Sequence, residues 1–360
     1  MTDSRPAPLT QADSRSVSLA AVDSRPAPPV PADPRSGPFS PTATPSAPPG
    51  APAATRTLHR TSRRGFLASV LAAGALAACG TEPAAPTPAA PTTTADTAAL
   101  DRELAAIQDR YAVRLAVYAR YRDRTVAHRA GEPIALCSTF KVYAAAAILR
   151  LESEGALDLA ETVPVRPAEI VVNSPVTQAA QGTELSYAQL CAAALTRSDN
   201  TAGNLLLRRI GGPAALTAFA RTVGDRATTL ERWEPELNRA ERGSLADTTT
   251  AEALATGYDA LLLGTALPQA QRRTLTDWMA ASTTSARRIR AALPPGWTAA
   301  DKTGGGDFGT VNDAGVLWAP DGTPLLLALL TDSTTGDPDA TPADAALAAA
   351  TAAVVAALTA

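Results

Sequence analysis

Lysine is almost missing from this chain of 360 residues. Lys141 and Lys302 are its only two lysines, against thirty arginines. Arginine keeps its proton in proteins, whereas a desolvated lysine can be tuned into a base. A chain that uses arginine almost everywhere else therefore marks its two lysines as candidate functional residues.

Histidine and aromatic residues are also scarce. His59 lies in the N-terminal leader, so His128 is the only histidine left beyond it. A lone histidine excludes a histidine-rich catalytic zinc site and argues against a serine–histidine triad. Aromatic residues make up 4% of the chain, so alanine and leucine must fill most of the core.

Positive charge is in deficit after the leader. Eight arginines and four aspartates precede Cys79, which leaves 24 basic and 31 acidic residues and a formal charge of −7. An acidic domain is poorly suited to bind nucleic acid or anionic lipid through its surface. We therefore expect no nucleic-acid partner, and membrane contact only through an anchor.

The first hundred residues do not show the pattern of a packed core. Residues 1–60 are Pro-rich and repeat a decapeptide in which aspartate precedes Ser-Arg or Pro-Arg. This composition predicts a disordered low-complexity extension, unless translation starts further along and the segment is never made. A Pro-, Ala- and Thr-rich tether is expected at 80–96.

Residues 61–79 resemble an export signal. Paired arginines at 63–64 precede an apolar run of fourteen residues, which is too short to span a bilayer. The arginines resemble a twin-arginine signal, and Leu-Ala-Ala-Cys at 76–79 resembles a lipobox that would place lipid on Cys79. The alternative is an ordinary cleaved leader with an incidental cysteine. We expect a protein anchored to the outer face of the cytoplasmic membrane, or a secreted or periplasmic one if the lipobox is not used.

Residues 97–360 have the pattern of one catalytic domain. Strands are predicted at 114–121, 125–129, 297–302, 311–319 and 325–331, with a final helix at 341–358. Helical patterns dominate between them, with a helical subdomain at about 138–280. Strands at both ends predict an α+β fold: one antiparallel sheet flanked by helices, built from both termini, with an inserted all-helical domain.

The segment Cys-Ser-Thr-Phe-Lys at 137–141 opens an apolar helical run. A helix has about 3.6 residues per turn, so Ser138 and Lys141 lie nearly one turn apart on one face. The pair predicts a nucleophile with a candidate base beside it.

Three further polar segments follow. Ser-Asp-Asn at 198–200 closes a helix with a capping-box start at 186–189, and alone it is ordinary helix-boundary chemistry. Lys-Thr-Gly-Gly-Gly at 302–306 follows a predicted strand and alone indicates a glycine-rich turn. The loop at 228–247 is long for a compact domain, which favours a functional role.

Two contacts are expected within this loop. Arg232 and Asp247 are placed to pair across its neck. The Glu234-Pro235 bond is a candidate cis bond that would turn the carboxylate inward.

Taken together, these four segments resemble the class A serine β-lactamases, in which Ser-x-x-Lys, Ser-Asp-Asn and Lys-Thr-Gly occur in this order. Each motif is weak alone, but the order and spacing of Ser138, Ser198, Glu234 and Lys302 are highly specific. The resemblance covers about 97–360. It implies hydrolysis of penicillin- and cephalosporin-type antibiotics, hence resistance, with no cofactor or metal and with a monomer as the default.

The resemblance also implies a role for each motif residue. Ser138 would attack the lactam carbonyl, and either Lys141 or Glu234 through a water would take its proton. Ser198 would pass a proton to the leaving nitrogen, and Glu234 would activate the water that cleaves the acyl-enzyme. The implied substrate-binding residues are Asn200, Asn238, Lys302, Thr303, Gly305 and Arg288, and the implied structural supports are Asn204, Arg232 and Asp247.

This chain departs from the family pattern at the cleft. Val311 occupies the position where many relatives place an arginine for the substrate carboxylate, and Arg288 falls where others have it. The alternative for Arg288 is one more surface arginine. Asn173 stands where many relatives carry an aromatic residue, so stacking on the substrate is not expected there.

The cysteines depart as well. Cys137 precedes the nucleophile as in a carbapenem-hydrolysing subgroup, but its partner position is Gly306. Cys191 faces Ala145 where relatives have a cysteine. We therefore expect no intramolecular disulfide.

Two other functions use the same first three motifs. One is a DD-carboxypeptidase that acts on cell-wall peptides, and the other is a penicillin-binding sensor lipoprotein that acylates without turnover. Glu234 and Asn238 argue against both, because they would provide the water that releases the acyl group.

Overall fold

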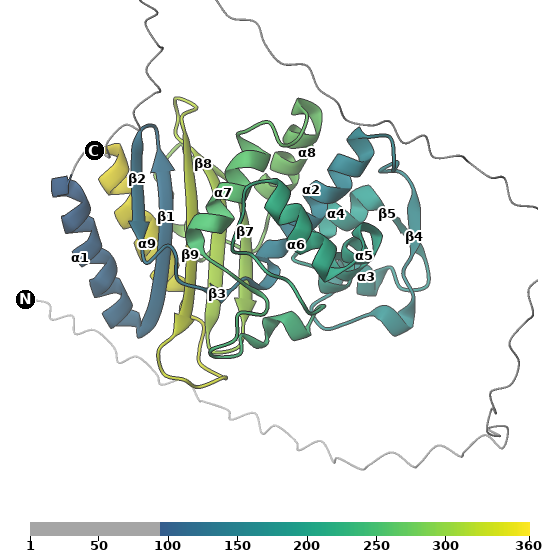
Figure 1. Cartoon of the computed structure of the whole chain (residues 1–360), viewed down its shortest axis with the longest axis horizontal. Coiled ribbons are helices and arrows are strands. Elements are labelled where there is room, and N and C mark those ends of the chain that lie inside the picture. The colour runs from purple at the N-terminus through teal and green to yellow at the C-terminus, as the bar shows by residue number, and fades with distance from the viewer. Residues whose placement is uncertain (1–93) are drawn as a thin grey trace, which may run out of the picture. The chain divides into compact units, whose positions relative to one another are not determined.

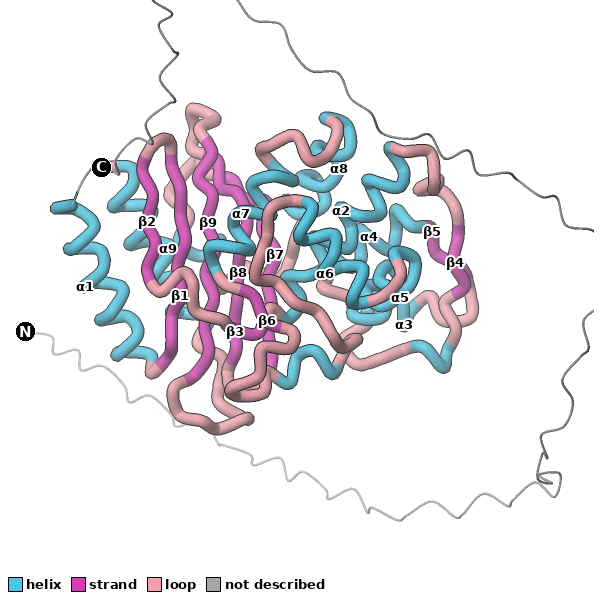
Figure 2. Tube along the Cα trace, viewed as in Figure 1, coloured by secondary structure: helices cyan, strands magenta, loops and turns pink. Residues whose placement is uncertain are grey.

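The computed structural model describes residues 94–360. The expected extension at 1–60 and the export signal at 61–79 with Cys79 lie outside the described residues. The tether expected at 80–96 lies outside them as far as residue 93, and its last three residues, 94–96, are helical. The described domain combines helices with an antiparallel sheet (Figures 1 and 2), which confirms the predicted α+β class. Within it, no helix has both the length and the apolar character needed to cross a membrane.

Five strands form the main sheet in the order β2-β1-β9-β8-β7. Their bounds are β1 Val113–Tyr121, β2 Arg124–His128, β7 Thr298–Gly306, β8 Thr310–Trp318 and β9 Pro324–Ser333. β1 pairs with β9 from Val113 opposite Ser333 to Tyr121 opposite Leu325. The two ends of the domain therefore join in one sheet, as the sequence predicts.

The central strand β9 is apolar from Pro324 to Leu330 because both of its faces are covered. Leu325, Leu327 and Leu329 contribute to one buried cluster, and Leu326 and Leu330 contribute to another. This alternation follows from the two-residue period of a strand. One leucine-rich strand therefore contributes to two cores.

Helices cover the two faces of the sheet (Figure 1). α1 (Thr94–Tyr111) and α9 (Asp344–Thr359) pack together against one face. α7 (Ala251–Leu262) and α8 (Gln269–Ala280) lie on the other face and connect it to the helical part. The sheet is thus buried from both sides.

The helical part surrounds α2 (Phe140–Ser153). Ten consecutive residues of α2, from Phe140 to Leu149, are buried, and all of them except Lys141 are apolar, so this helix is covered on every side. Its run of four alanines lets neighbouring helices approach closely. The remaining helices and short strands are α3 Pro175–Ala179, α4 Tyr187–Thr196, α5 Asn200–Ile210, α6 Pro213–Thr222, β3 Ile134–Ala135, β4 Thr162–Pro164, β5 Glu184–Ser186 and β6 Thr248–Thr249.

Within residues 94–360 there are also four short 3-10 helices: η1 Cys137–Thr139, η2 Pro167–Glu169, η3 Glu236–Arg239 and η4 Ile289–Ala292. The predicted capping box is present at the start of α4. The Gln189 N–H donates to Ser186 Oγ, and the Ser186 N–H donates to Gln189 Oε1. Two helix-terminal donors are satisfied in this way.

The segment at 302–306 taken alone indicates a glycine-rich turn, and this prediction is wrong. These residues form the end of β7, and Gly304, Gly305 and Gly306 pair with β8. Glycine is normally unfavourable in a strand. Here a Cβ on Gly304 would lie 3.1 Å from the Leu136 carbonyl oxygen, so the close approach of the η1 segment requires residues without side chains.

Candidate active site

The nucleophile candidate lies at the start of the buried central helix. η1 leads directly into α2, and this turn brings Lys141 Nζ to 2.8 Å from Ser138 Oγ. Lys141 is fully buried and Ser138 is 6% exposed. The predicted spacing of one helical turn therefore gives direct contact between amine and hydroxyl.

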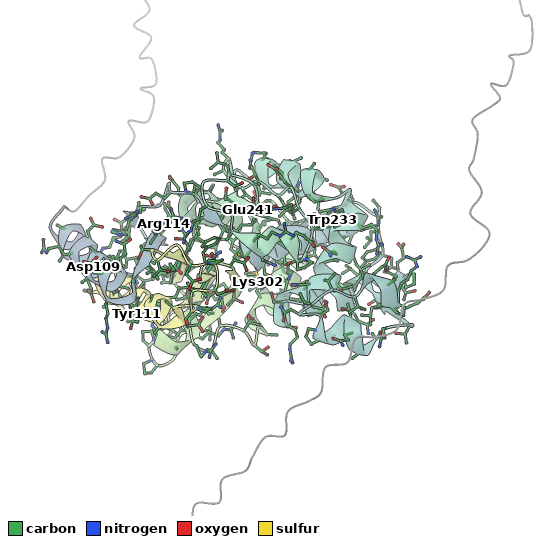
Figure 3. All side chains as sticks on the ribbon, turned by 90° about the horizontal axis from the view of Figure 1, so that it is seen from below. Asp109, Tyr111, Arg114, Trp233, Glu241 and Lys302 are labelled. Carbon is green, nitrogen blue, oxygen red and sulfur yellow. The ribbon has the colours of Figure 1, made fainter. Side chains whose placement is uncertain are left out.

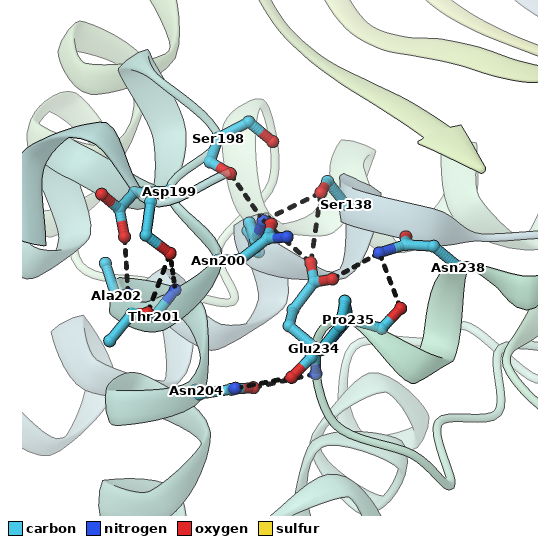
Figure 4. Close-up of polar contacts among 12 residues, drawn as sticks. Ser138, Ser198, Asp199, Asn200, Thr201, Ala202, Asn204, Glu234, Pro235 and Asn238 are labelled. Carbon is cyan, nitrogen blue, oxygen red and sulfur yellow. Dashed lines mark hydrogen bonds and ion pairs between the residues drawn. The ribbon is translucent and has the colours of Figure 1, made fainter. Parts of the chain in front are cut away.

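Lys141 is the centre of a buried polar network. Its Nζ also donates to the Ser198 carbonyl oxygen at 2.8 Å and to Asn200 Oδ1 at 2.7 Å. Glu234 Oε1 lies 2.9 Å from Nζ and accepts a longer bond of 3.3 Å from Ser138 Oγ. Figure 4 shows these contacts converging from the helical part and the long loop. Sequence spacing predicts that the residues are neighbours, but not that one amine joins them all.

Ser198 faces the second lysine. Lys302 Nζ donates to Ser198 Oγ at 2.9 Å and to the Thr303 carbonyl oxygen at 2.7 Å. Lys302 is fully buried and lies among the side chains in the middle of the domain (Figure 3). Burial, followed by the positive charge of Lys141, holds the pKa of Lys302 well below its ordinary value. Each serine therefore has a lysine within hydrogen-bond distance.

Asp199 fixes the turn that carries Ser198 and Asn200. It has no predicted role among the site residues. Its buried carboxylate accepts the Ala202 N–H as the cap of α5, which is ordinary helix-boundary chemistry. It also accepts the N–H groups of Val176 and Thr177 and the Thr177 hydroxyl. The N-cap role of Asp199 was predictable from the sequence, because acidic residues are common at this position. Its contacts with Val176 and Thr177 were not predictable.

The long loop turns Glu234 toward Ser138. The Glu234-Pro235 bond is cis, as predicted. Asn204 holds the Glu234 backbone from both sides, since its Nδ2 donates to the Glu234 carbonyl and its Oδ1 accepts the Glu234 N–H, both at 2.9 Å. Asn238 Nδ2 donates to Glu234 Oε2. Backbone and carboxylate are therefore both oriented.

The expected ion pair closes the neck of this loop. Arg232 Nε lies 2.5 Å from Asp247 Oδ2, and Asp247 Oδ1 accepts the N–H groups of Glu231 and Arg232. Asp247 is only 1% exposed. The hydrogen bond to Asp247 raises the pKa of Arg232 above its ordinary value. One carboxylate thus binds both the side chain and the backbone of the neck.

We predict that Arg232→Ala destabilises the domain by about 2 kcal/mol, because it leaves the buried carboxylate of Asp247 without its cation. Thermal unfolding of this variant, of Asp247→Asn and of the double variant measures the effect. The double variant should lose less than the sum of the single losses. Strictly additive losses would contradict a direct coupling.

An open cleft of about 240 Å³ lies beside these groups. It is lined by Ser138, Asn173, Arg197, Ser198, Asn200, Asn238, Thr284, Arg288, Thr303, Gly304 and Gly305. Eight of these eleven are residues that the sequence predicts as site residues or as a departure at the cleft mouth. Gly304 belongs to the predicted Lys-Thr-Gly motif, although no separate role was assigned to it. Arg197 and Thr284 were not predicted, because only the packing of two distant segments brings them to the cleft.

Arg288 is a cleft residue and not an ordinary surface arginine. Its side chain is 15% exposed, and its Nη1 donates to the carbonyl oxygens of Gly304 at 2.7 Å and Asn312 at 2.9 Å. Its Nε donates to Asp344 at 2.8 Å. Val311, the position used by many relatives, is buried. The guanidinium is thus fixed against the edge of β7.

The two cysteines in the described part of the chain, Cys137 and Cys191, are buried free thiols. Burial raises the pKa of both above the ordinary value for a thiol. A Cβ on Gly306 would lie 2.9 Å from Cys137 Sγ, so these two positions face each other across the η1–β7 contact. No metal-binding group of His, Cys, Asp and Glu occurs within residues 94–360.

This geometry defines a class of enzyme: serine hydrolases that transfer an acyl group with a lysine, rather than a histidine, beside the nucleophile. The family described as "Beta-lactamase enzyme family" matches residues 99–358. The chain therefore belongs to the β-lactamase family, and it is a class A serine β-lactamase.

Curated relatives and solved structures agree with this assignment. Beta-lactamase FAR-1 of Nocardia farcinica is 46% identical over 308 residues, which cover 84% of this chain and 97% of the relative. A beta-lactamase of Streptomyces lavendulae is 48% identical over 262 residues, covering 71% and 85%. The crystal structure of a beta-lactamase from Desulfarculus baarsii superimposes with a TM-score of 0.72 at 44% identity, covering 74% of this chain and all of that one. An ancestral class A beta-lactamase gives a TM-score of 0.68 at 43% identity, covering 72% and 99%.

Proposed function

We propose that the protein hydrolyses penicillin- and cephalosporin-type antibiotics through an acyl-enzyme on Ser138. The observation that carries this proposal is the buried network in which Ser138 Oγ contacts both Lys141 and Glu234. In the acylation step Ser138 Oγ bonds to the lactam carbonyl carbon, its proton leaves to the Lys141–Glu234 pair, and the carbon–nitrogen bond then breaks. Ser198 delivers a proton to the departing nitrogen. Lys302, which donates a hydrogen bond to Ser198 Oγ, then supplies a proton to Ser198.

Lys141 and Glu234 act as one acid–base unit in this proposal. Their charged atoms are 2.9 Å apart and fully buried, so a proton can pass directly between them. Lys141 is nearer to Ser138 Oγ, at 2.8 Å against 3.3 Å for Glu234. Glu234, the carboxylate of the pair, can receive the serine proton through a bridging water, and Lys141 can receive it once it has passed its own proton to Glu234.

The cleft supplies groups for the charges of the substrate. We assign the backbone N–H groups of Ser138 and Gly305 to the oxyanion, because both residues line the cleft. Lys302, Thr303 and Arg288 are assigned to the ring carboxylate. Asn200 is assigned to the side-chain amide of the substrate; its Nδ2 donates one N–H to the Val172 carbonyl and has a second N–H available.

Deacylation is assigned to Glu234 and Asn238. The Asn238 amide orients the Glu234 carboxylate, and a water held between them attacks the ester carbonyl. Attack by that water releases the product and restores Ser138. This step separates the proposal from a DD-carboxypeptidase or a non-turnover sensor.

One experiment tests the proposed function. The purified protein is mixed with a penicillin, and both hydrolysis and protein mass are followed. Catalytic hydrolysis with only transient mass gain is expected. A lasting mass gain without turnover would favour the sensor, and release of D-alanine from a cell-wall pentapeptide without lactam hydrolysis would favour the carboxypeptidase.

The lowered pKa of Lys302 predicts a loss of substrate binding at alkaline pH. As pH rises through this lowered pKa, Lys302 loses its proton and the cleft loses a cation for the substrate carboxylate. KM should therefore rise at a lower pH than the ordinary lysine pKa of about 10.4 would allow. In Lys302→Arg the alkaline rise should disappear, because arginine keeps its charge. An unchanged alkaline limb in this variant would assign the titration to another group.

The export proposal rests on sequence alone: twin-arginine transport, lipid on Cys79, and an enzyme monomeric at the outer face of the cytoplasmic membrane. Cys79→Ala should move the protein from the membrane fraction to the soluble fraction. Cys191→Ala is the matched control, because it removes a thiol elsewhere in the chain. An unchanged membrane fraction in Cys79→Ala would rule out lipidation, and sedimentation of the released protein tests the monomer.

A further inference from the structure

Arg197 carries an unpartnered guanidinium at the mouth of the cleft. It is the C-cap residue of α4, it is exposed, and it lines the cleft with Asn173 and Thr284. Within residues 94–360 its side chain forms no hydrogen bond and no ion pair. The charge is therefore available to a ligand that enters the cleft.

The other cations of the cleft already have assignments. Lys141 is paired with Glu234 at 2.9 Å, and Arg288 is paired with Asp344 at 2.8 Å. Lys302 contacts Ser198 and serves the ring carboxylate in the proposed function. Arg197 is thus a positive charge in excess of what a substrate with a single carboxylate requires.

The surrounding contacts show which part of a substrate lies near Arg197. The Thr283 N–H donates to the Thr196 carbonyl at 3.0 Å, which holds the turn that contains Arg197 against the Thr283–Thr284 segment. Thr284 Oγ1 in turn lies 2.6 Å from Thr303 Oγ1, in the region assigned to the ring carboxylate. Ser198, the next residue after Arg197, is the proton donor that the proposed function assigns to the lactam nitrogen, and this atom belongs to the fused ring. The ring side of the substrate therefore lies nearest to Arg197.

We propose that Arg197 is a specificity residue that binds a second anionic group carried on the fused ring. The substrates it favours are cephalosporin-type β-lactams whose C3 substituent bears a carboxylate or sulfonate. This inference rests on the proposed roles of Ser138, Ser198 and Lys302. An exposed ion pair of this kind changes the preference among substrates by about fivefold and leaves the chemical step intact.

The test uses three cephalosporins with one acylamino side chain and a different C3 group: neutral acetoxymethyl, cationic pyridiniummethyl and anionic sulfonate-bearing thiomethyl. kcat/KM is measured for the full-length protein and for Arg197→Gln, at low and at high salt. The ratio of variant to unmodified protein cancels the intrinsic reactivity of each compound. Arg273→Gln is the matched control, since it removes the same charge from an exposed position on α8 outside the cleft.

Arg197→Gln should lower kcat/KM about fivefold for the anionic compound, leave the neutral one nearly unchanged and slightly favour the cationic one, with smaller differences at high salt. In Arg197→Glu the cationic cephalosporin should become a better substrate, by kcat/KM, than the anionic one. Equal losses for all three compounds would assign Arg197 to the common ring carboxylate and overturn the proposal, as would the same pattern in Arg273→Gln. Failure of the unmodified protein to hydrolyse any of the three, or a penicillin, would instead overturn the proposed function.

Discussion

Replacing Glu234 with alanine is expected to give a protein that still reacts with a penicillin but releases the product about a thousandfold more slowly. The reason is that the proposed function assigns the hydrolytic water to Glu234 and Asn238, whereas the 2.8 Å contact between Ser138 and Lys141 involves neither of these residues. Loss of a positioned general base therefore slows hydrolysis of the acyl-enzyme more than it slows acylation, because only hydrolysis uses a water as the nucleophile. The acyl-enzyme should therefore accumulate.

Intact-protein mass spectrometry at successive times after mixing measures this prediction. The variant should carry the mass of one opened penicillin for many minutes, while steady-state hydrolysis falls. Glu236→Ala is the matched control, because Glu236 is an exposed carboxylate two residues along the same loop. Undiminished turnover in Glu234→Ala would remove this residue from the mechanism.

The sequence was sufficient for the parts of the site that depend on short-range geometry. Ser138 and Lys141 are one helical turn apart, so their contact follows from helix periodicity. The Arg232–Asp247 pair follows from opposite charges at the two ends of one loop. The class of fold was predictable because strand patterns occur at both ends of the domain and helical patterns lie between them.

Features that depend on packing between distant segments were not predictable. Local propensity excludes three glycines from a strand, but β8 pairs with them, and the approach of Leu136 to Gly304 leaves no room for a side chain. Arg197 was not singled out because its position at the cleft depends on the contact between Thr196 and Thr283, 87 residues apart in the chain. Residue type and spacing contain no signal for either arrangement.

Lys141→Ala is expected to slow acylation of Ser138 by about a thousandfold or more, because it removes the nearest proton acceptor. It also leaves Glu234 buried without its cation, which should cost about 3 kcal/mol of folding stability. Acylation is measured by rapid mixing, and stability by thermal unfolding. Because Lys141→Ala changes both stability and acylation, a second variant that keeps the charge of Lys141 is also tested.

Gly203→Ala provides this milder variant. A Cβ at Gly203 would lie 2.9 Å from Lys141 Cε, so the lysine must shift although its charge is kept. Acylation should slow by about tenfold, a smaller loss than in Lys141→Ala, because the base is displaced but present. Gly131→Ala is the control, because a Cβ there meets no atom within 4 Å. Unchanged acylation in Gly203→Ala would mean that the 2.8 Å contact is not required.

The mass of the protein during turnover then distinguishes the role of Lys141 from the role of Glu234. Variants at Lys141 should remain unmodified in the presence of a penicillin, whereas variants at Glu234 should be found as the acyl-enzyme. If Glu234 alone accepted the serine proton, Lys141→Ala would still be acylated rapidly, and both sets would accumulate the adduct. The two variants should therefore give opposite mass records, because each blocks a different step.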